Sequence, residues 1–374
     1  MSVFCWFAVM SYKNPKIPHF FLFLCIICLM EFTALYRKYR PQKFDDVVGQ
    51  DHIVSVLEGA VKRGEIAHAY LFSGTRGTGK TSVARILAKE IKTTATDLVE
   101  IDAASNTSVE DVRSLNESVH SLPFESKYKV YIIDEVHMLS KSAFNALLKT
   151  LEEPPKHVVF ILATTEMEKL PDTVVSRCQA FVFRKPTQKI LSDQIRKVSK
   201  KEGHTIEDDA AELIALLGDG SFRDALGILQ KVMSATEKKT IDAESTAKVT
   251  GAPSTKIIGR IISGIANKNA DETLGAVKEA VDANTDMKTF LKILLHKMRL
   301  LLLLKYAPEM KETIKSQLSG EEYKEFSSLA SDKAKEINSK TILELLEAFT
   351  RLPYAAVPQL PLEIAVINIC SGSR

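Results

Sequence analysis

From residue 30 to about residue 185, short apolar runs alternate with segments in which apolar residues recur every three or four positions. This alternation is typical of an α/β fold, a parallel sheet with helices on both faces. One helix is expected over residues 140–152, where Phe144, Leu147 and Leu151 share a face and a Pro-Pro pair follows. The five expected strands are residues 69–73, 98–102, 129–134, 158–164 and 180–183.

After Pro186 the strand pattern ends and the pattern becomes helical. A helix over residues 208–217 is expected to bury Leu213, Ile214 and Leu217, and the next helix to start near Ser221. Later helices are expected over 287–306 and 341–352. Residues 300–304 are all leucine, so that helix is apolar all round and buried on several sides, as a domain core or a subunit interface.

The pattern therefore predicts three domains: an α/β domain over residues 30–186, a small helical lid over 187–250, and an all-α domain over 251–374. Residues 1–29 stand apart, because they lead into an apolar run of eleven residues at 20–30. That run is short for a membrane span, and no small-residue cleavage pattern follows it. We expect an apolar leader outside the mature fold, with translation starting at Met30; a membrane anchor or a secretory signal are the alternatives.

Composition narrows the class of protein only slightly. The 374 residues are 45% hydrophobic and 26% charged, which is ordinary for a soluble protein. A net charge of +3 is too small to indicate nucleic-acid binding by itself, so any such contact needs a local surface or several assembled copies. The scattered cysteines suit reduced thiols in the cytoplasm. They are Cys5, Cys25, Cys28, Cys178 and Cys370.

The residues that follow the first strand form a phosphate-binding loop, Gly-Thr-Arg-Gly-Thr-Gly-Lys-Thr. Backbone N–H groups of such a loop, with the helix N-terminus behind it, attract a polyphosphate. Lys80 is expected to reach the β- and γ-phosphates, and the Thr81 hydroxyl to ligate Mg²⁺. The sequence thus predicts binding of a nucleoside triphosphate. The predicted loop residues are Gly74, Thr75, Arg76, Gly77, Thr78, Gly79, Lys80, Thr81 and Ser82.

An acidic pair ends the strand at 129–134, at the edge of the sheet that carries the loop. Asp134 is expected to hold Mg²⁺, directly or through water, and Glu135 to polarise the attacking water as a general base. The strand at 158–164 leads into Thr165, whose hydroxyl could orient the same water. Two arginines, Arg177 and Arg223, could stabilise charge on the γ-phosphate. On the residues alone, each arginine could equally be a surface or helix-capping residue.

Together these motifs resemble the clamp-loader class of AAA+ ATPases, and most of all the gamma/tau subunit family of bacterial DNA polymerase III. The resemblance extends over nearly the whole chain from Met30 and is strongest up to residue 226. The run from 137 to 155 is specific to this class. The segments that carry the resemblance are residues 36–41, 47–50, 73–82, 100–105, 134–140, 144–155, 163–165 and 176–178.

The resemblance implies a role for each site residue. Tyr36, Arg37, Pro41 and Val48 would line the adenine pocket. Thr165 would be the first sensor and Arg223 the second, both within the subunit. Arg177 would be a finger that reaches the ATP of a neighbouring subunit.

The same resemblance implies a molecular function. The C-terminal helices would form the collar of a pentameric ring that uses ATP and Mg²⁺ to open a sliding clamp and load it onto primed DNA during replication. Such a subunit carries the polymerase name through its holoenzyme, and no polymerase chemistry is expected here.

The sequence departs from the family in two respects. Only residues 91–97 lie where most bacterial relatives carry a four-cysteine zinc module, so we expect no zinc. The chain also resembles the family's short form, which leaves direct contact with the polymerase or helicase in doubt. DNA phosphates could be held by Arg113 and Lys149 without sequence readout, or these could be ordinary solvated residues.

Three rival functions stay open: a non-hydrolysing structural subunit of the loader, a branch-migration motor, and a replication-factor small subunit. The intact loop and acidic pair argue against the first, because a purely structural subunit has no need of them.

Overall fold

The computed structural model describes residues 33–105, 115–236, 239–315, 320–330 and 337–371. The chain divides into two compact units, residues 1–39 and 40–374. In the first unit the structure describes a short helix, α3 (Leu35–Lys38). The predicted leader, residues 1–29, and Arg113 lie outside the described residues.

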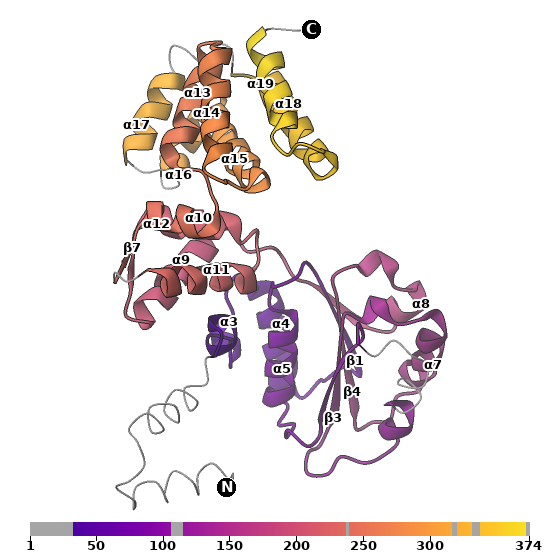
Figure 1. Ribbon diagram of the computed structural model, residues 1–374. Helices are drawn as coiled ribbons and strands as arrows, with labels where there is room; N and C mark the ends of the chain where they lie inside the picture. Colours follow the sequence, from indigo (N-terminus) through magenta and orange to yellow (C-terminus); the bar gives the residue numbers. More distant parts are fainter. Residues whose placement is uncertain (1–32, 106–114, 237–238, 316–319, 331–336, 372–374) are drawn as a thin grey trace, which may run out of the picture. The chain divides into compact units, whose positions relative to one another are not determined.

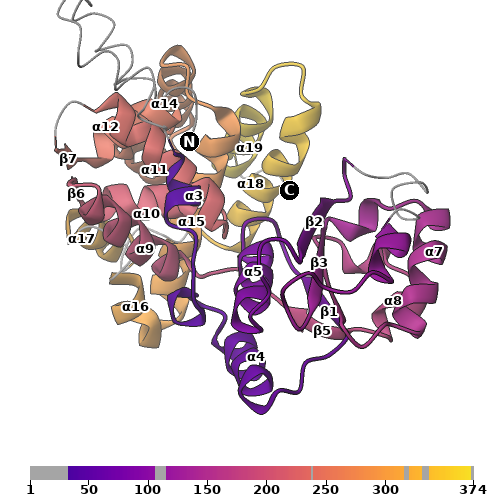
Figure 2. The same cartoon turned by 90° about the horizontal axis from the view of Figure 1, so that it is seen from below.

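A five-stranded parallel sheet with the order β2-β3-β4-β1-β5 organises the first part of the second unit (Figure 1). The strands are β1 (Ala69–Ser73), β2 (Leu98–Asp102), β3 (Lys129–Asp134), β4 (Val158–Thr164) and β5 (Gln179–Val182). Four match their predicted bounds, and β5 is shifted by one residue from the prediction. Figure 2 shows the sheet from a second side, with β2 and β5 at its edges.

Helices cover both faces of this sheet, as predicted (Figure 1). Alternate strand residues point to opposite faces, so Tyr70 and Phe72 pack with α4 (Asp51–Arg63) and α5 (Lys80–Glu90). Leu71 and Phe160 pack instead with α7 (Lys141–Glu152). Every residue of β1 and β4 is buried. Strands covered on both faces need apolar side chains throughout, which explains why these two read as unbroken apolar runs.

Local sequence determines both ends of the predicted helix at 140–152. Ser140 is the N-cap of α7 and its hydroxyl accepts the Ala143 N–H at 3.2 Å, so the helix itself starts one residue later. The helix ends at Glu152, just before Pro154 and Pro155. Shorter elements complete this region: η1 (Phe44–Asp46), η2 (Val136–Met138), η3 (Met167–Lys169) and α8 (Asp172–Val175).

The described residues between 188 and 250 form four helices and one small parallel strand pair. They are α9 (Gln188–Lys201), β6 (Thr205–Ile206), α10 (Asp208–Leu217), α11 (Phe222–Ala235), β7 (Thr240–Ile241) and α12 (Ala243–Thr250). The expectation that strands cease after Pro186 is therefore wrong. The Thr205 N–H donates to the Lys239 carbonyl at 2.8 Å. Two-residue strands are too short to leave a pattern of alternation. Ile214 is buried as expected, whereas Leu213 and Leu217 are only half-buried.

The remaining described residues are helical, as predicted. The helices are α13 (Thr255–Ala266), α14 (Ala270–Asp282), α15 (Met287–Tyr306), η4 (Pro308–Met310), α16 (Lys311–Lys315), α17 (Gly320–Ser328), α18 (Ser339–Arg351), η6 (Leu352–Tyr354) and α19 (Leu360–Ser371). In α15, Leu300, Leu301 and Leu304 are buried, and Leu302 and Leu303 pack partly buried against the same core. The five leucines are thus surrounded by other helices, as their pattern indicated.

The predicted helix at 341–352 begins two residues earlier, because a capping box forms there. The Asn338 side chain accepts the Thr341 N–H, and the Thr341 hydroxyl accepts the Asn338 N–H. The domain boundaries at 186/187 and 250/251 stay predictions. Over the described ranges, no helix is both long and apolar enough to cross a lipid bilayer.

Candidate nucleotide-binding and catalytic site

The loop between β1 and α5 has a backbone that only glycine adopts easily. Gly74 and Gly77 have φ angles of +145° and +76°. Space is also limiting: a Cβ at Gly74 would lie 2.6 Å from the Phe183 carbonyl oxygen. A Cβ at Gly77 would collide with the Ser221 side chain, whose own Cβ would lie 2.9 Å from it. The loop is therefore fitted against both the end of β5 and the start of α11.

Lys80, the first residue of α5, is buried within this loop, with 6% of the residue exposed. Its ammonium donates to the carbonyls of Gly74 at 2.7 Å and Thr75 at 3.1 Å. Burial lowers the pKa of Lys80, and the nearby carboxylates of Glu135 and Asp134 oppose that shift. The structure thus sets a lysine ammonium inside the loop, where the motif predicts the β- and γ-phosphates.

Thr81 and Asp134, the two predicted Mg²⁺ ligands, are brought together from α5 and the end of β3. The Thr81 hydroxyl donates to Asp134 Oδ2 at 2.7 Å. The other carboxylate oxygen accepts the Glu135 N–H at 3.0 Å. Both side chains present oxygen atoms, the donor type that Mg²⁺ requires. These residues therefore fit a Mg²⁺ ion.

Glu135 follows directly and has an unusual backbone, with φ +48° and ψ +44°. A non-glycine residue in this left-handed region costs about 1–3 kcal/mol, and such residues concentrate at functional sites. The Glu135 carboxylate accepts the Thr165 hydroxyl at 2.9 Å and the Thr165 N–H at 3.3 Å. The predicted base and the predicted first sensor thus contact each other, although they lie on different strand ends.

His137 is a residue of this site that the sequence interpretation missed, although it belongs to the Asp-Glu-Val-His run. Only 5% of its side chain is exposed. The ring lies between β3 and β4 and contacts Thr164 and Glu166. Its position two residues after the predicted base was the available signal, but a single histidine does not reveal its partners.

The two predicted arginines have different surroundings. Arg223 lies in the first turn of α11, and the preceding Phe222 N–H donates to the Gly77 carbonyl at 3.0 Å. The helix of Arg223 thus begins at the phosphate loop. Arg177 lies between α8 and β5, and its guanidinium binds Glu152 at 2.7 Å and the Thr173 carbonyl at 2.7 Å. The contacts described for Arg177 are therefore with the last residue of α7 and with α8.

The predicted adenine-pocket residues are divided between the two units. Tyr36 and Arg37 belong to the first, where the guanidinium lies 5.9 Å from the tyrosine ring centroid. Val48 belongs to the second and is 39% exposed.

Gln50, two residues further on, was not predicted to matter. It is fully buried and exchanges two hydrogen bonds with the Arg184 backbone, at 2.8 and 3.2 Å. It therefore ties this segment to the chain that follows β5.

Lys149, the other predicted DNA contact, is exposed on α7, which is compatible with a phosphate contact but does not test it. Residues 91–97 link α5 to β2 directly. The parts of the chain that the structure describes contain no cluster of three or more His, Cys, Asp or Glu residues that could bind a metal. The absence of zinc stays a prediction.

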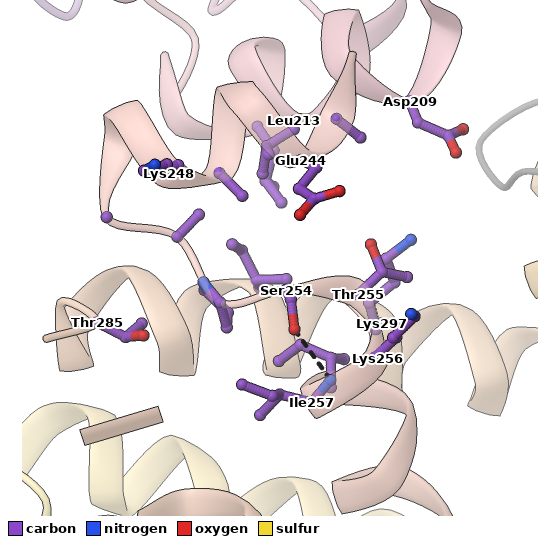
Figure 3. A pocket seen from close by; sticks show the side chains of 18 of the residues that line it. Asp209, Leu213, Glu244, Lys248, Ser254, Thr255, Lys256, Ile257, Thr285 and Lys297 are labelled. Atoms are coloured by element: carbon purple, nitrogen blue, oxygen red, sulfur yellow. Dashed lines mark hydrogen bonds between the residues drawn. The ribbon is translucent and has the colours of Figure 1, made fainter. Parts of the chain in front are cut away.

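A large pocket of about 790 Å³ lies elsewhere, lined by residues of α10, α12, α13 and α15 (Figure 3). No predicted site residue lines it. Burial raises the pKa of Glu212 in this pocket to about 7, which Lys297 opposes. Burial also lowers the pKa of His296 to about 4, helped by neighbouring lysine and arginine charges. The pocket mixes both signs of charge and holds none of the predicted phosphate-binding residues, so it is separate from the nucleotide site.

The sheet order, the loop and the acidic strand end define a AAA+ P-loop protein. A solved structure of the Thermotoga maritima RuvB Holliday junction branch migration motor is similar in fold, with a TM-score of 0.50. It is 24% identical and the match covers 61% of this chain and 79% of that one. This likeness concerns the fold alone.

Sequence comparisons identify the family. Residues 49–106 and 91–187 match the family described as DNA polymerase III, delta subunit, and residues 241–374 match DNA polymerase III subunits gamma and tau domain III. The gamma subunit of Buchnera aphidicola is 40% identical, with 61% of this chain and 68% of that one covered. The chain belongs to the gamma/tau family of DNA polymerase III subunits.

Two longer relatives show how much of such proteins this chain spans. The tau subunit of Bacillus subtilis is 37% identical over 92% of this chain and 64% of its own length. The Escherichia coli tau subunit is 39% identical over 70% of this chain and 44% of its own length. The chain therefore spans between two fifths and two thirds of these relatives.

Proposed function

We propose that this chain is an ATP-hydrolysing subunit of a clamp loader, which uses ATP to open a sliding clamp and load it onto primed DNA during replication. One observation carries the proposal: four of the predicted Mg²⁺-binding and catalytic residues meet in two pairs at the carboxyl end of the sheet. Thr81 contacts Asp134 at 2.7 Å and Thr165 contacts Glu135 at 2.9 Å. A purely structural subunit would need neither pair.

The chemistry follows from these positions. Loop N–H groups and Lys80 bind the β- and γ-phosphates, and Thr81 and Asp134 hold Mg²⁺. When bound, Mg²⁺ neutralises charge on the β- and γ-oxygens. Glu135 accepts a proton from the attacking water, and Thr165 orients that water from the end of the neighbouring strand β4. The left-handed backbone of Glu135 supports a functional role for this residue, because non-glycine residues in that conformation concentrate at active sites.

The arginines complete the site in two ways. Arg223 approaches the γ-phosphate within the chain, because its helix begins at the phosphate loop. Arg177 acts on the ATP of a neighbouring subunit, exchanging its Glu152 partner for phosphate. That pair is a weak restraint, since 33% of the Arg177 side chain and 50% of the Glu152 side chain are exposed. Hydrolysis in this proposal therefore depends on assembly.

Assembly into a pentameric ring with other loader subunits is supported by the C-terminal helices. Large apolar side chains are exposed on α18, on α19 and on the segment between them, and exposed apolar surface marks protein interfaces where it gathers. They are Leu343, Leu346, Tyr354, Val357, Leu360, Ile364 and Ile367.

Tyr36, Arg37, Pro41 and Val48 would line the adenine pocket. Lys149, and Arg113 outside the described residues, would contact DNA phosphates. We place the protein in the cytoplasm, at the replisome.

Steady-state ATP hydrolysis tests the proposal. The full chain is assayed with the partner loader subunits, with and without the matching sliding clamp and primed DNA. We expect strong stimulation that is lost in Lys80→Ala and in Arg177→Ala. Hydrolysis indifferent to clamp and DNA would indicate another AAA+ machine, such as a branch-migration motor. Tight ATP binding without hydrolysis would indicate a structural subunit.

A further inference from the structure

His137 lies in η2, directly after the acidic pair, with its ring between the ends of β3 and β4. Its Nδ1 atom lies 3.0 Å from the Thr164 hydroxyl and 3.5 Å from a Glu135 carboxylate oxygen. Its Nε2 atom lies 3.2 Å from a Glu166 carboxylate oxygen. With only 5% of the side chain exposed, these contacts take up both nitrogens of an almost fully buried ring.

The chemistry of the neighbours sets the hydrogen positions. An ionised carboxylate only accepts, so the Nε2 atom facing Glu166 carries a hydrogen. Glu166 is ionised, because hydrogen bonding to the Lys169 ammonium at 2.7 Å holds the pKa of Glu166 below its ordinary value. In the neutral ring Nδ1 then accepts the Thr164 hydroxyl hydrogen. The Thr164 oxygen in turn accepts the Glu166 backbone N–H at 3.0 Å.

These contacts close a ring around Thr165. The ring joins the Glu166 side chain, His137, Thr164 and the Glu166 backbone, so it fixes the residues on both sides of Thr165. Thr165 itself donates its hydroxyl and its N–H to Glu135. His137 therefore ties the strand end that carries the proposed base to the strand end that carries the proposed sensor.

We propose that His137 is a positioning residue that sets Thr165 against Glu135 for ATP hydrolysis. This inference rests on the proposed function of Glu135 as the general base. His137 makes none of the described contacts of the phosphate loop, so its loss should spare ATP binding. Misplacement of a catalytic group by about 1 Å can cost on the order of 100-fold in rate. We expect His137→Ala to lower kcat by about 10- to 100-fold and to change the KM for ATP by less than about threefold.

A double-mutant cycle tests whether His137 acts through this ring. His137→Ala, Glu166→Ala and the double variant are compared in the assembled loader with clamp and DNA. If both residues belong to one ring, the double variant should be no slower than His137→Ala by more than about twofold. If the losses in kcat of the two single variants multiply in the double variant, the proposal is overturned. His157→Ala is the matched control, because His157 is a half-buried histidine of the same domain that contacts the Val119 carbonyl at 3.1 Å.

Conservative variants keep the test decisive should the alanine variant fold poorly. His137→Gln can keep a donor toward Glu166, and His137→Asn can keep an acceptor toward Thr164. Both should retain more kcat than His137→Ala, with ATP affinity unchanged in each. A kcat within about twofold of wild type in all three variants would overturn the inference.

Glu135→Gln separates this inference from the proposed function. If Glu135→Gln still hydrolyses ATP normally, the proposed base is wrong. If that variant is inactive while the His137 variants hydrolyse normally, the inference alone is wrong.

Discussion

Asp97 offers the sharpest test of how the nucleotide-binding domain is held together. It ends the short link between α5 and β2, and only 2% of it is exposed. Its carboxylate accepts the backbone N–H groups of Phe124, Glu125 and Ser126 at 2.6, 2.9 and 2.8 Å. Burial alone would raise the pKa of Asp97. The three N–H groups and the Ser126 hydroxyl outweigh it and hold the pKa well below its ordinary value.

Asp97→Asn keeps the shape but turns an amide NH₂ toward N–H groups that need an acceptor. Two of the three N–H groups contact the same carboxylate oxygen, so this substitution removes at least one and as many as two acceptor contacts. A hydrogen bond to a charged group contributes about 1.5–3 kcal/mol, so we expect a loss of about 3 kcal/mol in the free energy of unfolding at pH 7.

The sign of the pH dependence follows from the depressed pKa. The stabilising contribution is present above the unfolded pKa of about 3.9 and is lost as pH falls from there through the folded pKa. The difference between wild type and Asp97→Asn should therefore shrink below about pH 4.

Urea denaturation followed by circular dichroism, at pH 7 and at several acidic pH values, measures both effects. Asp45→Asn is the control, since Asp45 is an exposed aspartate of the same domain. A difference at pH 7 below about 0.5 kcal/mol, the range of ordinary surface substitutions, would show that the Asp97 carboxylate does not hold residues 124–126 as described. So would a difference that stays constant through the acid range.

Three further predictions concern other parts of the chain. Gly77→Ala should lower the rate of ATP hydrolysis, because the added Cβ meets the Ser221 side chain. Ser221→Gly in the same chain should restore part of that rate. A double variant in which the two single losses simply add would contradict this explanation. Burial raises the pKa of Glu212 to about 7, so between about pH 4.3 and pH 7 the folded state holds a proton that the unfolded state has lost. The free energy of unfolding should therefore fall as pH rises from about 4.3, the pKa of an unfolded glutamate, toward about 7. Urea midpoints at pH 5 and pH 8 should therefore differ less in Glu212→Gln than in wild type. Glu152→Ala removes an exposed partner of Arg177 at a cost of about 0–1 kcal/mol and should leave ATP hydrolysis by the assembled loader intact, whereas Arg177→Ala should not. Equal loss in both variants would show that the ion pair itself matters.

Local sequence accounts for much of the sheet and of the phosphate site. The apolar runs of β1 and β4 are buried on both faces, so their pattern correctly predicts the first and last residue of each strand. The loop motif and the acidic strand end then meet, because parallel strands present their carboxyl ends at one edge of the sheet. The contact between Thr81 and Asp134 follows from that geometry.

Long-range pairings were not predictable in the same way. Asp97 has its partners at residues 124–126, and His137 has one of its partners at Glu166, beyond the next strand. Nothing in the local pattern distinguishes either side chain from a solvated one. The two-residue strands β6 and β7 form only because other elements bring residues 205 and 240 together. Such contacts depend on tertiary packing that hydrophobic periodicity does not encode.

The most direct test of the central claim is clamp loading itself. A fluorescently labelled sliding clamp and primed DNA are mixed with the loader assembled around this chain, and clamp retained on DNA is measured with ATP. We predict ATP-dependent loading and release by wild type, no loading by Lys80→Ala, and loading without release by Glu135→Gln. Equal loading by wild type and Lys80→Ala would contradict it.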